Sequence, residues 1–254
     1  MRIQILASSL EAAPKRHYAS CYVINGTVAI DAGQVGLWGT PQQQSDLLHI
    51  FLTHPHIDHI ATLPIFLENA WDPAKEAVVL HGSGETLQAL HRHILNDIVW
   101  PDFVRTTLPE RPFLRLQELR PEEEVEVEGL CVLPVEVSHI VPTLGFIVTD
   151  GRSTVVFGAD SGATQRIWEL AWQTPEPRSV FLEAAFPNSM SGLAERAGHL
   201  TPQMFAGEVL KMPRMENVIA VHIKARLRET IERELSALGI AGLTIAEGGE
   251  TYEL

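Results

Sequence analysis

The sequence predicts an α/β protein in which two β-sheets pack together and helices lie on the outside. Short runs rich in valine, isoleucine and threonine recur along the chain. Turn dipeptides such as Asn25-Gly26 and Asp150-Gly151 bound them, which is typical of strands and hairpins. Strands come both early and late, and helical segments lie between them. This order is typical of two packed sheets with outer helices.

Apolar patterning and turn signals place the individual elements. Strands are expected over residues 3–7, 21–25, 27–31, 48–53, 78–81, 125–128, 131–137, 146–149, 153–157, 180–183, 218–222 and 243–246. Helices are expected over residues 59–69, 85–98, 164–172, 202–210 and 227–238. Thr201-Pro202 provides an N-cap followed by proline at the first helical position, and Gly239 directly follows the last helix.

The composition is that of an ordinary globular protein. The chain has 254 residues, of which 45% are hydrophobic, and we expect residues 1–254 to form a single domain. No apolar run approaches the ~20 residues that span a membrane, and the first residues resemble a strand rather than a signal peptide. We therefore expect a cytoplasmic protein with no membrane partner. Cys21 and Cys131 are too few for a disulfide framework and are expected to be buried free thiols.

The chain is acidic, with a formal net charge of −13 and an isoelectric point near 5.3. Nonspecific binding to long nucleic acid depends on Lys and Arg side chains that neutralise phosphates, so this charge argues against a nucleic-acid partner. A small anionic substrate is still compatible with it, because bound cations can dominate the local field. The unusual feature of the composition is histidine, with 11 residues.

A cluster of residues that can bind metal ions directly follows the apolar run 50–52: His54, His56, Asp58 and His59. Residues two apart on a strand point to the same side, so His54 and His56 can bind one ion. Asp58 and His59 fall where the chain turns into a helix, from where they can reach a second ion. A single histidine at a strand end is usually a hydrogen-bonded polar residue, but four candidates this close together favour a metal site.

Further candidate ligands follow apolar runs at later strand ends, namely His139, Asp160 and His222. Taken singly, each is equally well explained as a hydrogen-bonded polar residue. Imidazole and carboxylate ligands suit zinc, manganese or iron, and no cysteine lies nearby in the sequence to supply a thiolate.

The pattern HxHxDH at residues 54–59, placed after a strand, resembles the signature of the metallo-β-lactamase superfamily. The resemblance covers nearly the full chain and includes the opening strands within residues 22–33. It implies an α/β fold of the αβ/βα four-layer sandwich type, with two mixed β-sheets, helices outside and the metals at one edge between the sheets. It also implies that Asp31 supports the metal site without binding the ions itself.

The resemblance gives each candidate ligand a place around two divalent ions. Zinc is the first expectation, with manganese or iron as alternatives. The implied ligands are His54, His56 and His139 for the first ion, Asp58, His59 and His222 for the second, and Asp160 as the bridge.

Other segments resemble class II 3′,5′-cyclic-nucleotide phosphodiesterases, in the same order along the chain. These segments are residues 93–103, 182–188, 198–202 and 221–224. Ala185 and Ala225 depart from that family, which tends to have serine and proline at these positions. The family also makes a homodimer possible.

This closer resemblance implies hydrolysis of a small-molecule phosphodiester, cyclic AMP or cyclic GMP, to the 5′-nucleotide. A metal-bound hydroxide would attack phosphorus, with Asp58 counted among the catalytic residues. His199 would donate a proton to the leaving oxygen, and Glu183 would orient His199. Thr201 would cap the following helix and fix this loop.

The remaining implied contacts are to the substrate, from Asn96, Trp100 and Lys224. Core packing is the more favoured role for Trp100, and a solvated side chain explains Lys224 equally well.

Two alternatives remain open. The segments around Glu183 and His199 also resemble the tRNA 3′-processing endonucleases, which usually carry a basic, glycine-rich arm to hold tRNA. The sequence has no such arm, and its acidic charge weakens this alternative further. The other alternative is a member that binds metal without turnover, against which the intact ligand set argues.

Overall fold

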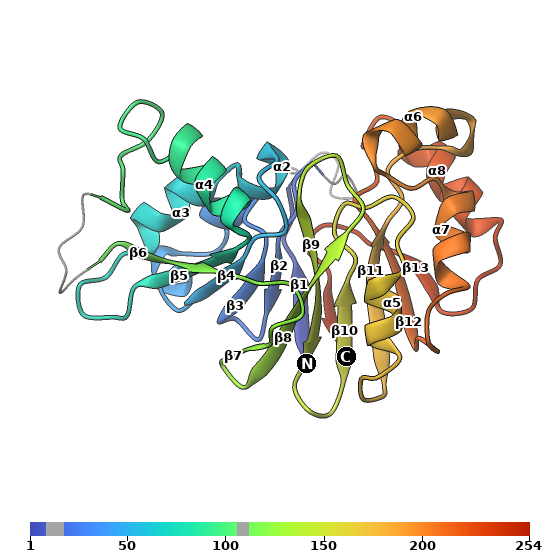
Figure 1. The fold of residues 1–254 in the computed structure, drawn as a ribbon, viewed down its shortest axis with the longest axis horizontal. Helices are drawn as coiled ribbons and strands as arrows, with labels where there is room; N and C mark the ends of the chain where they lie inside the picture. Colours follow the sequence, from blue (N-terminus) through green and yellow to red (C-terminus); the bar gives the residue numbers. More distant parts are fainter. Residues whose placement is uncertain (9–17, 106–111) are drawn as a thin grey trace.

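The computed structural model describes residues 1–8, 18–105 and 112–254, and it contains two mixed β-sheets that face each other (Figure 1). The first sheet has the order β14 (Thr251–Glu253), β1 (Arg2–Ile5), β2 (Tyr22–Ile24), β3 (Val28–Ile30), β4 (His49–Phe51), β5 (Val78–Gly82) and β6 (Leu114–Glu118). Strands β3 to β6 are parallel, and β14, β1, β2 and β3 pair antiparallel.

The second sheet mirrors this arrangement. Its order is β13 (Leu243–Ile245), β12 (Asn217–Val221), β11 (Arg178–Glu183), β10 (Thr154–Phe157), β9 (Thr143–Thr149), β8 (Leu130–Val137) and β7 (Val125–Val127). Strands β10 to β13 are parallel, and β7 to β10 pair antiparallel. The turn at Asp150-Gly151 joins β9 to β10, so the predicted hairpin is confirmed.

Helices lie outside both sheets (Figure 1). The first half of the chain has η1 (Val35–Leu37), α1 (Pro41–Gln44), α2 (Ile57–Ile60), α3 (Leu63–Ala70) and α4 (Gly84–His93). The second half has α5 (Arg166–Ala171), η2 (Asn188–Met190), α6 (Ser191–Ala197), α7 (Pro202–Val209) and α8 (Arg228–Ser236). Thr201 caps α7 by accepting a hydrogen bond from the Met204 amide, and Gly239 adopts φ +63° just past α8, as predicted.

Three apolar layers hold the sheets and helices together. Aromatic side chains such as Phe51, Phe146 and Phe181 fill the space between the two sheets. A second layer packs α3 and α4 against the first sheet, and a third packs α5, α7 and α8, with the buried Trp168, against the second sheet. The layers follow the order helix, sheet, sheet, helix, so the predicted αβ/βα sandwich is confirmed.

The sequence prediction was wrong about several element boundaries. The helix expected over 59–69 is broken between α2 and α3, because Pro64 has no amide hydrogen to bond a carbonyl one turn back. The helix expected over 85–98 ends at His93, after which Leu95 forms a bridge to Trp100. Strands β6 and β14 were missed because they are edge strands with few buried side chains, and the short α1 and α6 were missed as well.

Cys21 is buried, as predicted, but Cys131 is only half-buried, because β8 pairs there with the exposed edge strand β7. No helix among the described residues is long and apolar enough to cross a membrane. The cytoplasmic location stays a prediction.

Candidate metal centre

The candidate site lies at one edge of the sandwich, where strands of both sheets end. In the first sheet, Asp31 follows β3 and His54 follows β4. In the second sheet, His139 follows β8, Asp160 follows β10 and His222 follows β12. These strand ends lie at the same edge because β9 runs antiparallel to both β8 and β10, and β10 to β12 are parallel. Asp58 and His59 come from α2, directly above β4.

The structure brings His54, His56, His139 and Asp160 together, with one possible ligand atom of each lying within 4.8 Å of the others. His54 Nε2 lies 2.9 Å from His56 Nδ1, and His139 Nε2 lies 3.5 Å from the same atom. His54 and Asp160 are buried, whereas His56 and His139 are half-exposed. The group therefore has one side open to solvent.

A second group consists of Asp58, His59, Asp160 and His222, whose possible ligand atoms also lie within 4.8 Å of one another. Asp160 Oδ1 lies 3.5 Å from His59 Nε2, and Asp160 Oδ2 lies 3.2 Å from His222 Nε2. Asp58 Oδ2 approaches His222 Nε2 at 3.8 Å. Asp160 thus belongs to both groups, in the position that the family resemblance implies.

Hydrogen bonds behind the first-sheet histidines fix which ring nitrogen carries the proton. Asp31 Oδ2 accepts a bond from His59 Nδ1 at 2.7 Å. Thr53 donates its only hydroxyl proton to Asp31, so its oxygen accepts from His54 Nδ1 at 2.9 Å. Both rings therefore direct Nε2 toward the cluster, which is the nitrogen with which they could bind a metal ion.

The second-sheet histidines are supported in the same way. His139 Nδ1 donates to the Gly198 carbonyl oxygen at 2.8 Å, which leaves its Nε2 as an acceptor. His222 Nδ1 lies 3.4 Å from the Ser20 hydroxyl. Gly198 has φ +64°, and a Cβ on it would come within 3.0 Å of His139, so this close contact requires glycine.

The converging nitrogen atoms fit a bound cation. The Nε2 lone pairs of His54 and His139 both face His56 Nδ1, and His59 Nε2 is buried without a hydrogen-bond partner. Burying an unpaired polar atom costs about 1–3 kcal/mol, and a metal ion coordinated by these nitrogens removes that cost. The donor set of imidazoles and carboxylates is one that binds divalent transition metals.

The charge states of the cluster also suit metal binding, which requires unprotonated imidazole. Burial lowers the pKa of His54, His56 and His139, and lowers the pKa of His222 to about 4. His59 is different: burial lowers its pKa, but the Asp31 and Asp160 carboxylates outweigh burial and raise the pKa well above its usual value. A cation at His59 Nε2 competes with that proton for the same lone pair.

The backbone is strained at three points around the cluster. Asp31, Ala159 and His222 have φ values of 61°, 54° and 51°, in the left-handed region that favours glycine. Such conformations cost roughly 1–2 kcal/mol per residue, and here they turn the chain sharply at strand ends that carry site residues.

Glu183 and His199 form a buried pair beside the metal ligands. Glu183 Oε1 accepts a hydrogen bond from His199 Nδ1 at 2.6 Å, and the same carboxylate accepts from the Ser161, Ala185 and Leu200 amides. The His199 ring stacks on His222, with centroids 5.6 Å apart. Burial and the Asp160 charge raise the pKa of Glu183, against which the three amide donors act. Burial lowers the pKa of His199, and Lys224 lowers it further.

The expected substrate contacts fall in different places. Lys224 Nζ lies 5.2 Å from the Phe186 ring centroid, on the His199 side of the cluster. The Asn96 amide is used within its own loop, where its oxygen accepts from the Ile98 and Val99 amides. Trp100 packs against the core layer beneath α4, which agrees with the packing alternative.

Sequence reasoning missed three supporting residues. Thr53 could have been noticed, because it immediately precedes His54, and Gly198 because it precedes His199 in a matched segment. Ser20 had no signal, since it lies 202 positions from His222.

We expect Asp31→Asn to weaken metal binding by about 10- to 100-fold. Asp31 Oδ1 accepts from the Thr53 amide, so the new amide nitrogen would take the Oδ2 position and meet the His59 Nδ1 hydrogen instead of accepting it. Competition with a chromophoric chelator measures the affinity. Asp72→Asn, at a surface aspartate that bonds the Ala74 amide, is the control. Equal affinity in a folded Asp31 variant would contradict this role.

Comparisons with known proteins agree with the geometry. The chain is similar to 3′,5′-cyclic-nucleotide phosphodiesterase 1 of Saccharomyces cerevisiae, with 29% identity over 92 residues, which are 35% of this chain and 24% of that protein. It is also similar to ribonuclease Z of Pseudomonas putida, with 35% identity over 130 residues, which are 48% of this chain and 36% of that protein. The alignments thus span about a quarter to a third of these relatives.

The crystal structure of unliganded yeast PDE1 has the same fold, with a TM-score of 0.78 and 18% identity over 98% of both chains. The family model described as beta-lactamase superfamily domain matches residues 30–223, a range that contains all of the candidate ligands. The chain therefore belongs to the metallo-β-lactamase superfamily.

Proposed function

We propose that this hydrolase of the metallo-β-lactamase superfamily is a dinuclear-metal phosphodiesterase that converts 3′,5′-cyclic nucleotides to 5′-nucleotides. The observation that carries the proposal is the Glu183–His199 pair, because it holds a proton donor against the His222 ligand, where a leaving oxygen would need one. The similarity to the yeast cyclic-nucleotide phosphodiesterase adds support for the substrate. The acidic chain, with a net charge of −13, favours a small substrate over long nucleic acid.

The protein's own residues have distinct tasks in this proposal. Bound divalent ions, zinc first and manganese or iron otherwise, would activate water and neutralise phosphate charge. Glu183 accepts the Nδ1 hydrogen of His199 and stabilises the ring when it carries a positive charge. In its protonated form His199 carries a proton at Nε2, and transfer of this proton to the leaving 3′-oxygen is worth about 10²–10⁴-fold in rate.

The substrate contacts in this proposal are Lys224, beside His199, and more weakly Asn96 and Trp100. Lys224 is the best placed of the three, because Phe186, over which it lies, also contacts the His199 ring at 5.6 Å. We further propose that residues 1–254 form one domain, supported by the apolar layer that both sheets share.

A second candidate is a tRNA 3′-processing-like endonuclease. The similarity to ribonuclease Z of P. putida, at 35% identity over 130 residues, favours it. The shared chemistry is metal-assisted phosphodiester hydrolysis, so only the substrate separates it from the first candidate. A third candidate is a member that binds metal without turnover. The two complete groups of possible ligands argue against this candidate.

Metal analysis and a substrate panel test the proposal together. We expect the purified protein to bind about two equivalents of divalent metal. We expect it to hydrolyse cyclic AMP, cyclic GMP or both faster than bis-p-nitrophenyl phosphate or a tRNA precursor. Removal of the metal with EDTA should abolish this activity, and added zinc or manganese should restore it. Turnover of the generic ester alone would overturn the cyclic-nucleotide assignment, and preferential cleavage of the tRNA precursor would favour the second candidate.

A further inference from the structure

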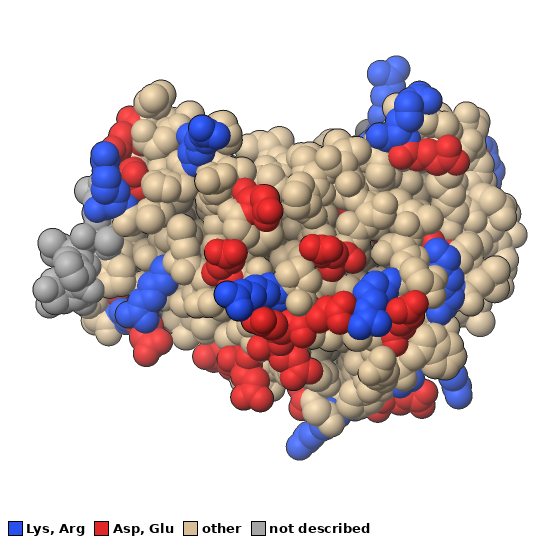
Figure 2. Space-filling view, in the orientation of Figure 1, with Lys and Arg blue, Asp and Glu red and all other residues tan. Residues whose placement is uncertain are grey.

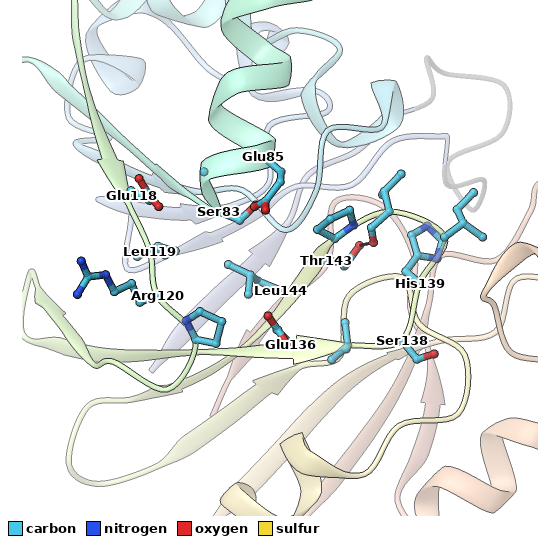
Figure 3. Close-up of a pocket in the computed structure, with 16 residues that line it drawn as sticks. Ser83, Glu85, Glu118, Leu119, Arg120, Glu136, Ser138, His139, Thr143 and Leu144 are labelled. Atoms are coloured by element: carbon cyan, nitrogen blue, oxygen red, sulfur yellow. Dashed lines mark hydrogen bonds between the residues drawn. The ribbon is translucent and has the colours of Figure 1, made fainter.

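A groove of about 590 Å³ opens beside the metal-ligand cluster. Its wall includes His139 and the turn that follows, the first residues of α4 and the end of β6 (Figure 3). His139 belongs both to this wall and to the first group of ligands, so the groove borders the site at this residue. We call it the His139 groove.

Three carboxylates from separate elements line the His139 groove. Glu85 comes from α4, Glu118 from β6 and Glu136 from β8 (Figure 3). Among the described residues, none of the three forms an ion pair. Of the described residues in the wall, Arg120 is the one Lys or Arg, and it lies 3.7 Å from Glu123. Figure 2 shows that acidic side chains also gather across the middle of the molecule, with basic side chains among them.

The carboxylate of Glu118 lies against the first residue of α4. Its Oε1 atom would be 3.1 Å from a Cβ placed on Gly84. The positive end of the helix dipole favours a negative charge there, so this carboxylate is held at the groove wall.

One lysine, Lys224, lies on the His199 side of the cluster. Lys224 lies over Phe186, and the Phe186 ring contacts the His199 ring at 5.6 Å. The His199 ring also lies 5.0 Å from the His139 ring, so Lys224 and the acidic groove border neighbouring histidines of the site.

We propose that the His139 groove receives an organic group esterified to the phosphate, such as the nucleoside of a cyclic nucleotide, and selects a neutral or cationic group over an anionic one. The inference rests on the proposed phosphodiester chemistry and narrows its substrate class. Carboxylates accept hydrogen bonds from hydroxyl, amino and ammonium groups and repel a second phosphate. A cyclic nucleotide has one phosphate and an uncharged nucleoside, whereas an RNA chain places further phosphates on each side of the scissile one.

Binding of small phosphate esters to the metal-loaded protein tests the selection without turnover. The probes are phosphoethanolamine, ethyl phosphate and 2-sulfoethyl phosphate, which share a phosphate and differ in the charge of a two-carbon substituent. Calorimetry should give affinities that fall in this order, with about tenfold between the extremes. This difference between the highest and the lowest affinity, which we call the spread, should shrink in about 1 M salt, where charges are screened beyond about 3 Å.

The variants assign the effect to the groove. Glu85→Gln, Glu118→Gln and Glu136→Gln combined should reduce the spread to less than about twofold, with each single change having a smaller effect. Glu126→Gln is the matched control, because Glu126 is an exposed glutamate on β7, outside the groove. An unchanged spread in the triple variant, or no spread in the wild type, would overturn the inference.

Turnover separates this inference from the proposed function. Hydrolysis of 4-nitrophenyl phosphocholine should exceed that of 4-nitrophenyl ethyl phosphate in the wild type, and the ratio should approach one in the triple variant. If no diester is hydrolysed while the binding order persists, the proposed function fails and the groove selection stands. If both diesters are hydrolysed at equal rates and the binding order is absent, the groove selection fails and the phosphodiesterase proposal stands.

Discussion

Asp160→Asn is expected to lower phosphodiester turnover by about 10³-fold or more and to reduce the bound metal by about half or more. Asp160 belongs to both groups of possible ligands. Its Oδ1 atom lies 3.5 Å from His59 Nε2 and its Oδ2 atom lies 3.2 Å from His222 Nε2. The substitution keeps the side chain's size but removes the negative charge between the two groups. Its kcat/KM on cyclic AMP and its metal content by elemental analysis measure the two effects.

The control for this prediction is Asp46→Asn. Asp46 is exposed and forms an ion pair with Lys75, so its loss should change turnover by less than about twofold. A thermal melt should show that the Asp160 variant is folded in the presence of metal. Full metal content with near-normal turnover in that variant would rule out Asp160 as a bridging ligand.

His199→Ala is expected to reduce turnover according to the leaving group. For substrates with a poor leaving group, such as cyclic nucleotides, the loss should be about 10²–10⁴-fold, because the leaving oxygen needs a proton. For esters of 4-nitrophenol, whose leaving group is stable without a proton, the loss should be within about tenfold. Measuring kcat for both classes on the metal-loaded variant gives the comparison.

A matched control separates proton donation from damage to the site. His93→Ala removes an exposed histidine at the end of α4 and should leave both substrate classes unaffected. The metal content of the His199 variant must also match that of the wild type, because the His199 ring stacks on His222. Equal losses on the two classes would mean that His199 positions the site rather than donates a proton.

The sequence predicted the layers of the fold well because most strands are buried on both faces. Residues of β10 and β11, for example, are buried at every position, and each strand contains an apolar run, at residues 155–157 and 180–182. Strands β6 and β14 lie at the two opposite edges of the first sheet, where exposed positions carry polar side chains and the apolar pattern disappears. The break between α2 and α3 depends on where Pro64 falls within a single turn, which hydrophobic periodicity does not resolve.

The ligand set could be predicted because its spacing reflects the geometry of strand ends, and the structure does bring these residues together. The contacts that support these ligands could not be predicted from the sequence. Ser20 reaches His222 only because β2 and β12 come together in space, and the Gly198 carbonyl acts through the backbone, which a side-chain pattern does not report. Likewise the His139 groove combines residues of α4, β6 and β8, and no local motif marks it.

The division of the ligands between two sheets has a consequence for folding. His54 and His59 belong to the first sheet's edge, and Asp160 and His222 belong to the second. Each group of possible ligands takes side chains from both sheets, so an ion bound in either group would act as a cross-link between two halves of the chain, and its binding free energy would add to the stability of the assembled sandwich. Neither half can bind the ion fully alone, so metal occupancy reports whether the two sheets have closed on each other.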